Sequence, residues 1–222
     1  MQVRWCRRRR AARRPGWAGA LARSARRTAA LLLCLAGPQA QAETFTQSGL
    51  SFSDERGGFR ILGVSGHASL DDPIVVVEEV TDPGTAVLVV RGLGPALGNR
   101  IRTAHPAGFA LRKIVINGTR ESWTIYDIEL QIALGTSSDR FDGLSFGQGV
   151  QVLRPFSSSV FGMNLSQEEP RDALLFYDGL VRPGEQVAMD FVITATRAVP
   201  EFFLVQQQDR PLAGTLSGEA WP

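Results

Sequence analysis

The chain has very little cysteine and histidine, which restricts the chemistry it can perform. Both cysteines, Cys6 and Cys34, fall before residue 43 of the 222, and His67 and His105 are the two histidines. Residues 43–222 therefore have no disulfide. Two separated histidines are too few for a zinc site, which needs three or four imidazole, thiolate or carboxylate ligands. Gly143-Leu144-Ser145-Phe146-Gly147 matches the Gly-x-Ser-x-Gly pattern, but a nucleophile elbow needs a strand-to-helix turn, and no helix is expected there. No phosphate-binding glycine motif occurs.

Acidic residues are absent before Glu43, whereas ten arginines precede Thr28. A short apolar run, Ala29–Ala36, follows the arginines, and Ala40-Gln41-Ala42 then supplies the small residues that a signal peptidase recognises. The run is too short to span a bilayer, which needs about 20 apolar residues. This order predicts a secretory signal peptide over residues 1–42 and a protein exported to the periplasm or the exterior, without a transmembrane anchor. A basic arm that binds nucleic acid is the alternative, but it does not explain the apolar run and the cleavage site.

Loss of this leader reverses the charge of the chain. The whole chain has 24 basic and 22 acidic residues, and residues 43–222 retain 14 basic and 22 acidic residues, a net charge of −8. Binding to nucleic acid needs clustered lysine and arginine, so this balance argues against nucleic acid as a partner. The remaining length suffices for one domain with its own apolar core.

Alternating and β-branched runs, separated by Gly, Pro, Asn and Asp, dominate residues 43–222. The runs Ile74–Val80 and Ala86–Val90 are apolar on both faces, as central strands are. Asn117-Gly118 stands between two apolar runs and predicts a tight hairpin, because both residues tolerate positive φ. Eight to ten strands and no convincing helix predict a single all-β domain, a two-sheet antiparallel β-sandwich or jelly roll. The tail from Asp209 is expected to be loose.

Several segments resemble bacterial exported β-sandwich proteins of the PEP-CTERM type. In that family an Asn-Gly turn precedes a tryptophan and an amphipathic strand, and a Pro-Gly turn precedes a late apolar strand. The resemblance implies an exported β-sandwich and no particular activity. Val199-Pro200-Glu201 is not followed by the membrane helix and basic cluster of the family's sorting tail. The matching segments are Asn117-Gly118-Thr119, Trp123, Asp127-Ile128-Glu129-Leu130, Phe176-Tyr177-Asp178-Gly179, Pro183-Gly184-Glu185 and Phe203-Leu204-Val205-Gln206.

The strand expected after Asn117-Gly118 supplies the catalytic candidates. Apolar and polar residues alternate along it, so Asp127 and Glu129 share one face, about 7 Å apart by strand rise. Glycosidases use pairs of carboxylates at such separations, which makes these two residues candidates in a carbohydrate-active jelly roll. The alternative, which the strict alternation favours, is the solvated polar face of an amphipathic strand.

Two further sets of residues are candidates for binding. Trp123 and Tyr126 are close enough to the carboxylates to stack on a sugar ring, although a core position is the simpler reading for Trp123. Asp139 and Asp142 cluster in one polar loop and could bind calcium, which takes six to eight oxygen ligands. The alternative for this loop is ordinary turn chemistry, since Asp before Gly favours a tight turn.

The sequence as a whole favours a non-catalytic function. The shortage of histidine and cysteine argues against an enzyme, and no cofactor is expected apart from calcium. We therefore expect an exported β-sandwich that acts as a binding or structural module for a protein or glycan partner. A carbohydrate-binding or carbohydrate-active jelly roll is the alternative.

Overall fold

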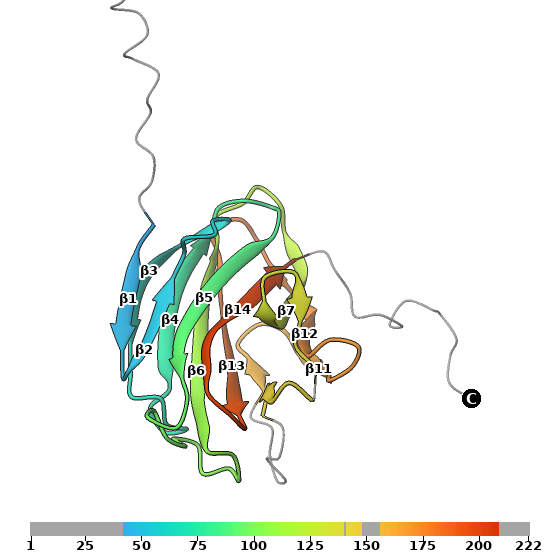
Figure 1. The fold of residues 1–222 in the computed structure, drawn as a ribbon. Coiled ribbons are helices and arrows are strands. Elements are labelled where there is room, and N and C mark those ends of the chain that lie inside the picture. Colours follow the sequence, from blue (N-terminus) through green and yellow to red (C-terminus); the bar gives the residue numbers. More distant parts are fainter. Residues whose placement is uncertain (1–41, 140, 148–155, 209–222) are drawn as a thin grey trace, which may run out of the picture. The chain divides into compact units, whose positions relative to one another are not determined.

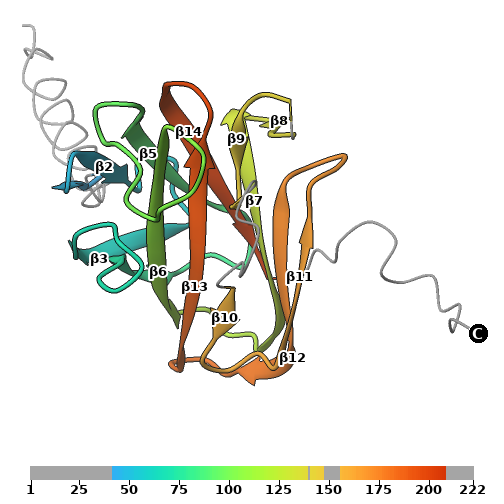
Figure 2. The same ribbon diagram turned by 90° about the horizontal axis from the view of Figure 1, so that it is seen from below.

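The computed structural model of the protein describes residues 42–139, 141–147 and 156–208. These residues form two β-sheets that pack face to face, and they contain no helix (Figure 1, Figure 2). The all-β sandwich predicted from the sequence is confirmed. The 14 strands exceed the expected eight to ten, partly because three of them have two residues each and leave no pattern in the sequence. Residues 1–41 of the predicted signal peptide and the tail from Asp209 lie outside the described residues.

The two sheets differ in size. The larger has eight strands, and its spatial order is β1 (Thr44–Gln47), β2 (Leu50–Ser53), β5 (Ala86–Leu93), β14 (Val199–Gln207), β7 (Trp123–Ala133), β12 (Ala173–Val181) and β11 (Met163–Gln167), with β8 (Thr136–Ser137) paired to β7. The smaller has six, in the order β10 (Ser157–Ser158), β13 (Gln186–Ala195), β6 (Ala107–Asn117), β4 (Ile74–Val80) and β3 (Phe59–Ser65), with β9 (Leu144–Ser145) paired to β13. As predicted, the apolar runs β4 and β5 are both internal to their sheets.

The smaller sheet is mixed and not purely antiparallel as we expected. β4 runs parallel to β6, with Val76 opposite Lys113 and Glu78 opposite Val115. The chain leaves the smaller sheet after β4, forms β5 in the larger sheet, and returns to place β6 beside β4. Two neighbouring strands reached by such a crossover can run in the same direction, which a direct hairpin does not allow.

The predicted hairpin at Asn117-Gly118 is wrong. β6 ends at Asn117 in the smaller sheet, and β7 begins at Trp123 in the larger one, so this turn crosses between sheets. The buried Asn117 side chain fixes the corner. Its Nδ2 donates to the carbonyl oxygens of Glu121 at 2.7 Å and Val181 at 3.0 Å. A hairpin and a sandwich corner leave the same alternating pattern, and the pattern does not identify the strand that pairs.

Glycines in and after β3 mark a bulge and a close approach of the backbone. The pairing of β3 with β4 slips by one residue between Ile61 and Gly63, which is a bulge. Gly66 has a φ of +93°, and a Cβ atom there would lie 1.9 Å from the carbonyl oxygen of Pro73. The chain therefore needs glycine at position 66, because the backbone is left-handed and closely approached.

The main core lies between the sheets and is built from apolar side chains of both. Burial of each large apolar side chain contributes about 1.5–3 kcal/mol. Since residues 43–222 have no cysteine, this core and not a disulfide holds the sheets together. Its largest members include Phe52, Leu88, Tyr126, Phe176 and Phe202 from the larger sheet and Ile74, Phe109 and Phe191 from the smaller.

Candidate functional site

Asp127 and Glu129 lie on the outer face of the larger sheet, but they are not solvated. Tyr126, Ile128 and Leu130 of β7 belong to the core, so alternation turns the two carboxylates outward. The exposed fractions of Asp127 and Glu129 are nevertheless 0% and 2%. The sequence-based prediction of a solvated polar face is therefore wrong.

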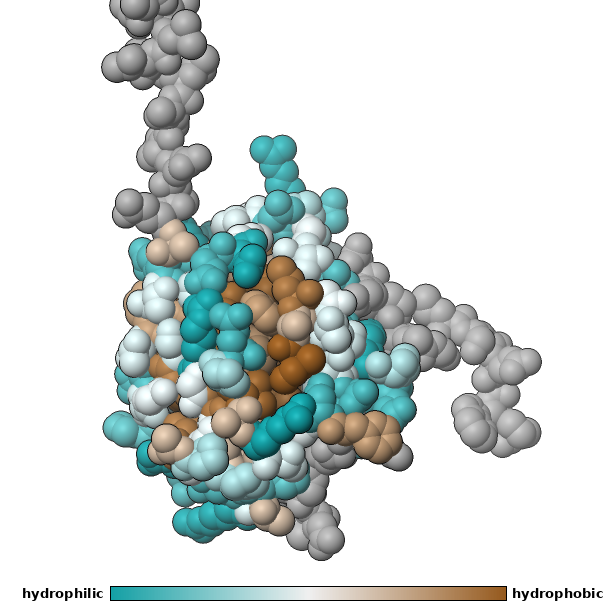
Figure 3. Space-filling model, viewed as in Figure 1, coloured by the Kyte–Doolittle hydropathy of each residue, from teal (hydrophilic) through white to brown (hydrophobic). Residues whose placement is uncertain are grey.

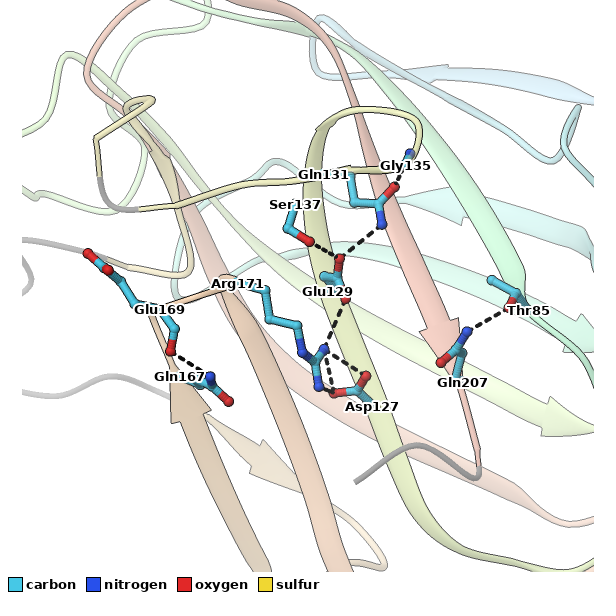
Figure 4. Close-up of polar contacts among 10 residues, drawn as sticks. All are labelled: Thr85, Asp127, Glu129, Gln131, Gly135, Ser137, Gln167, Glu169, Arg171 and Gln207. Atoms are coloured by element: carbon cyan, nitrogen blue, oxygen red, sulfur yellow. Dashed lines mark hydrogen bonds and ion pairs between the residues drawn. The ribbon is translucent and has the colours of Figure 1, made fainter. Parts of the chain in front are cut away.

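An arginine that the sequence analysis missed lies against both carboxylates (Figure 4). Nη1 of Arg171, just before β12, is 3.0 Å from Asp127 Oδ2 and 3.0 Å from Glu129 Oε2. The Arg171 side chain is itself 13% exposed. Arg171 follows the carboxylates by more than 40 residues and reaches them because β12 pairs with β7. Only that long-range pairing reveals the contact, and no local sequence signal marks it.

The second oxygen of Glu129 is also engaged. Oε1 of Glu129 accepts hydrogen bonds from Ser137 Oγ at 2.6 Å and Gln131 Nε2 at 2.9 Å. Gln131 Oε1 in turn accepts from the backbone N–H of Gly135 at 2.7 Å. These contacts tie β7, β8 and the start of β12 together (Figure 4). A guanidinium has only donors, so both carboxylates act toward Arg171 as acceptors.

The predicted ligand-stacking residues are in the core. Trp123 is 3% exposed and Tyr126 is fully buried. Their ring centroids lie 5.6 Å apart with the planes tilted by 59°, a common packing geometry for two aromatic rings. Neither ring offers a face to solvent, so the proposed stacking role does not fit their positions, and the simpler core reading of Trp123 does.

A polar group between the sheets was also missed by the sequence analysis. Lys113 Nζ lies 2.7 Å from Glu78 Oε2, with both side chains fully buried, and 5.9 Å from the centroid of the Phe59 ring. Across the core, the Tyr126 hydroxyl donates to Gln206 Oε1 at 2.6 Å. Alternation does contain a signal for this group, because Glu78 shares a strand face with Ile74 and Val76.

Burial shifts both ionisable groups of this pair toward their neutral forms. It raises the pKa of the Glu78 carboxyl and lowers the pKa of the Lys113 ammonium, and the attraction between the two charges offsets only part of each shift. Burial also raises the pKa of the Tyr126 hydroxyl, and the Glu78 charge adds to that shift. The group therefore lies in a medium that disfavours charge, and no described pocket reaches it.

The two aspartates proposed to bind calcium organise the loop between β8 and β9. Asp139 Oδ1 accepts from the backbone N–H of Phe141 at 2.8 Å. Asp142 Oδ1 accepts from the backbone N–H of Leu144 at 2.9 Å and from Ser138 Oγ at 3.0 Å. Within the described residues, no group of three or more His, Cys, Asp or Glu is arranged to hold a metal ion. These contacts are those of an Asp-stabilised turn, and calcium binding remains a prediction.

An open hollow of about 660 Å³ lies on the larger sheet, next to the face that carries the carboxylates. Ile132, Ala133 and Leu134 line it from the end of β7, and Val199, Pro200, Glu201 and Phe203 line it from β14. Arg56, Arg197 and Ala198 complete its wall. This volume lies within the range of small-molecule and peptide-binding sites.

Comparisons with protein-family models, with curated proteins and with solved structures gave no match. In the part of the chain that the structure describes, no helix has the length and apolar character needed to cross a membrane.

Proposed function

We propose that the protein is an exported, non-catalytic β-sandwich that acts as a binding or structural module for a protein or glycan. The observation that supports this best is that its clustered carboxylates are buried and paired with an arginine. Asp127 and Glu129 are buried, and they share one guanidinium nitrogen of Arg171 at 3.0 Å each. A general acid must come within hydrogen-bond reach of the atom that it protonates, and carboxylates with almost no exposed surface are poorly placed for that.

The export part of the proposal rests on the leader and on the charge of residues 43–222. The order of arginines, apolar run and Ala40-Gln41-Ala42 is that of a secretory signal. The resemblance to exported PEP-CTERM-type sandwiches agrees with this assignment. A domain without cysteine folds in an oxidising compartment without the risk of incorrect disulfides.

The proposal is tested with purified residues 43–222 and a panel of polysaccharides, with released reducing ends as the measured product. We expect no release above the level of a heat-denatured sample. The carbohydrate-active alternative predicts release that disappears in an Asp127→Asn/Glu129→Gln variant and persists in an Asp190→Asn/Glu185→Gln variant. The latter makes the same charge change at two exposed ion pairs.

A further inference from the structure

The hollow on the larger sheet forms where two neighbouring strands separate. β14 pairs with β7 from Phe203 to Gln207, opposite Asp127–Gln131. β14 pairs with β5 on its other side from Val199 onward, and no pairing joins Val199–Phe202 to β7 within the described residues. The end of β7 and the start of β14 thus leave a wedge between them, and the hollow occupies it.

The floor of the wedge is apolar and continues along the sheet. Leu134 is 49% exposed, and Phe203 belongs to an outer-face cluster with Val87, Val89 and Val205. Figure 3 shows apolar residues gathered in the middle of this face, surrounded by hydrophilic ones. The cluster residues are at most 8% exposed, so Leu134 is the large apolar side chain that the wedge offers to another molecule.

The wall of the wedge carries excess positive charge. Arg56 and Arg197 border the hollow, and neither has a hydrogen bond or ion pair to an acidic side chain among the described residues. Arg56 Cζ lies 5.9 Å from the centroid of the Phe203 ring. Glu201, the acidic residue of the lining, is 2.6 Å from Arg91 Nη2, which also binds Glu55 at 2.7 Å. Arg56 and Arg197 can therefore bind an acidic ligand, although residues 43–222 have a net charge of −8.

We propose that this wedge binds an extended acidic segment of a partner protein. An extended backbone fits between two strands that diverge, as in other cases where a peptide adds to a sheet. Acidic side chains of such a segment reach Arg197 and Arg56, which lies over the Phe203 ring, and apolar side chains contact Leu134. Guanidinium groups bind carboxylates through paired hydrogen bonds, which accounts for the acidic preference. This inference rests on the proposed binding function and specifies its site and ligand class.

The test is calorimetric titration of residues 43–222 with a capped hexapeptide that alternates valine and glutamate. Two control peptides replace the glutamates with glutamine or lysine. We expect the glutamate peptide to bind, the glutamine peptide to bind more weakly and the lysine peptide not to bind. Arg56→Gln/Arg197→Gln should weaken binding of the glutamate peptide about tenfold or more.

The matched control is Arg60→Gln/Arg182→Gln, which removes the same charge from two exposed arginines paired elsewhere. It should leave the affinity for the glutamate peptide unchanged. Equal affinity for all three peptides, or equal loss in both double variants, would overturn the proposal. So would absence of peptide binding together with Arg56- and Arg197-dependent binding of polygalacturonate, which would assign the wedge to an acidic glycan. Polysaccharide hydrolysis would contradict the non-catalytic function but has no bearing on these affinities.

Discussion

Lys113 Nζ lies 2.7 Å from Glu78 Oε2 between the two sheets, and neither side chain has exposed surface. Removing one partner of a buried ion pair leaves the other in an apolar medium, which costs about 3–5 kcal/mol. Replacing both partners by apolar residues of similar size is often neutral or stabilising. The pair therefore contributes little net stability, although each member depends on the other.

The first prediction is a double-mutant cycle on this pair. Lys113→Met and Glu78→Leu should each lower the free energy of unfolding by about 3–5 kcal/mol, and the double variant should recover most of that loss. Urea denaturation of the four proteins measures the cycle. The exposed pair Arg112–Asp190 is the control, and its cycle should give about 1 kcal/mol or less. Losses at Lys113 and Glu78 that simply add would show that the two groups are not coupled.

The pH dependence of the same pair is the second prediction. The folded pKa of Glu78 is raised, so its cost to stability begins above the unfolded value near 4.5 and is complete above the folded pKa. The folded pKa of Lys113 is lowered, so its cost is present below the folded pKa and disappears as the pH rises toward 10.5. Relative to the Lys113→Met/Glu78→Leu variant, the wild type should therefore be least stable at intermediate pH. Unfolding free energies of both proteins, measured across this pH range, check this dependence. A wild type that is instead most stable at intermediate pH, relative to the variant, would mean that the pair is ionised and net stabilising.

The third prediction concerns Trp123, which packs against Tyr126 in the core. Trp123→Ala removes a large buried side chain and leaves a cavity, so it should cost about 3–5 kcal/mol. Trp123→Phe keeps an aromatic ring at that site and should cost clearly less. Thermal or urea unfolding compares the two variants. Equal stability of wild type and Trp123→Ala would place the ring outside the core.

Processing of the leader gives the fourth prediction. Because Ala40-Gln41-Ala42 follows the apolar run, the exported protein should begin at Glu43. Intact-mass measurement of protein from the periplasmic or culture fraction checks this terminus. Replacement of Ala40 and Ala42 with bulky residues should block cleavage. A protein that is exported with residues 1–42 attached would refute the assigned cleavage site.

The sequence predicts most of this fold, because local alternation determines which residues form strands and which face the core. It identified β4 and β5 as internal strands and predicted the all-β class. It did not identify strand partners, so Asn117-Gly118 was expected to form a hairpin and instead forms a corner between sheets. The prediction for the candidate site was wrong for the same reason. Asp127 and Glu129 have a polar alternation typical of a solvated face, and only the pairing of β12 with β7 brings Arg171 onto them.

Urea denaturation of the Asp127→Asn/Glu129→Gln variant tests most directly the claim that the clustered carboxylates serve the fold and not catalysis. The variant leaves Arg171, which is 13% exposed, without its two counter-charges. The account predicts a loss of about 3–5 kcal/mol in unfolding free energy, and a much smaller loss for the exposed Asp190→Asn/Glu185→Gln control. A variant as stable as the wild type that has also lost a polysaccharide-hydrolysing activity of the wild type would contradict it.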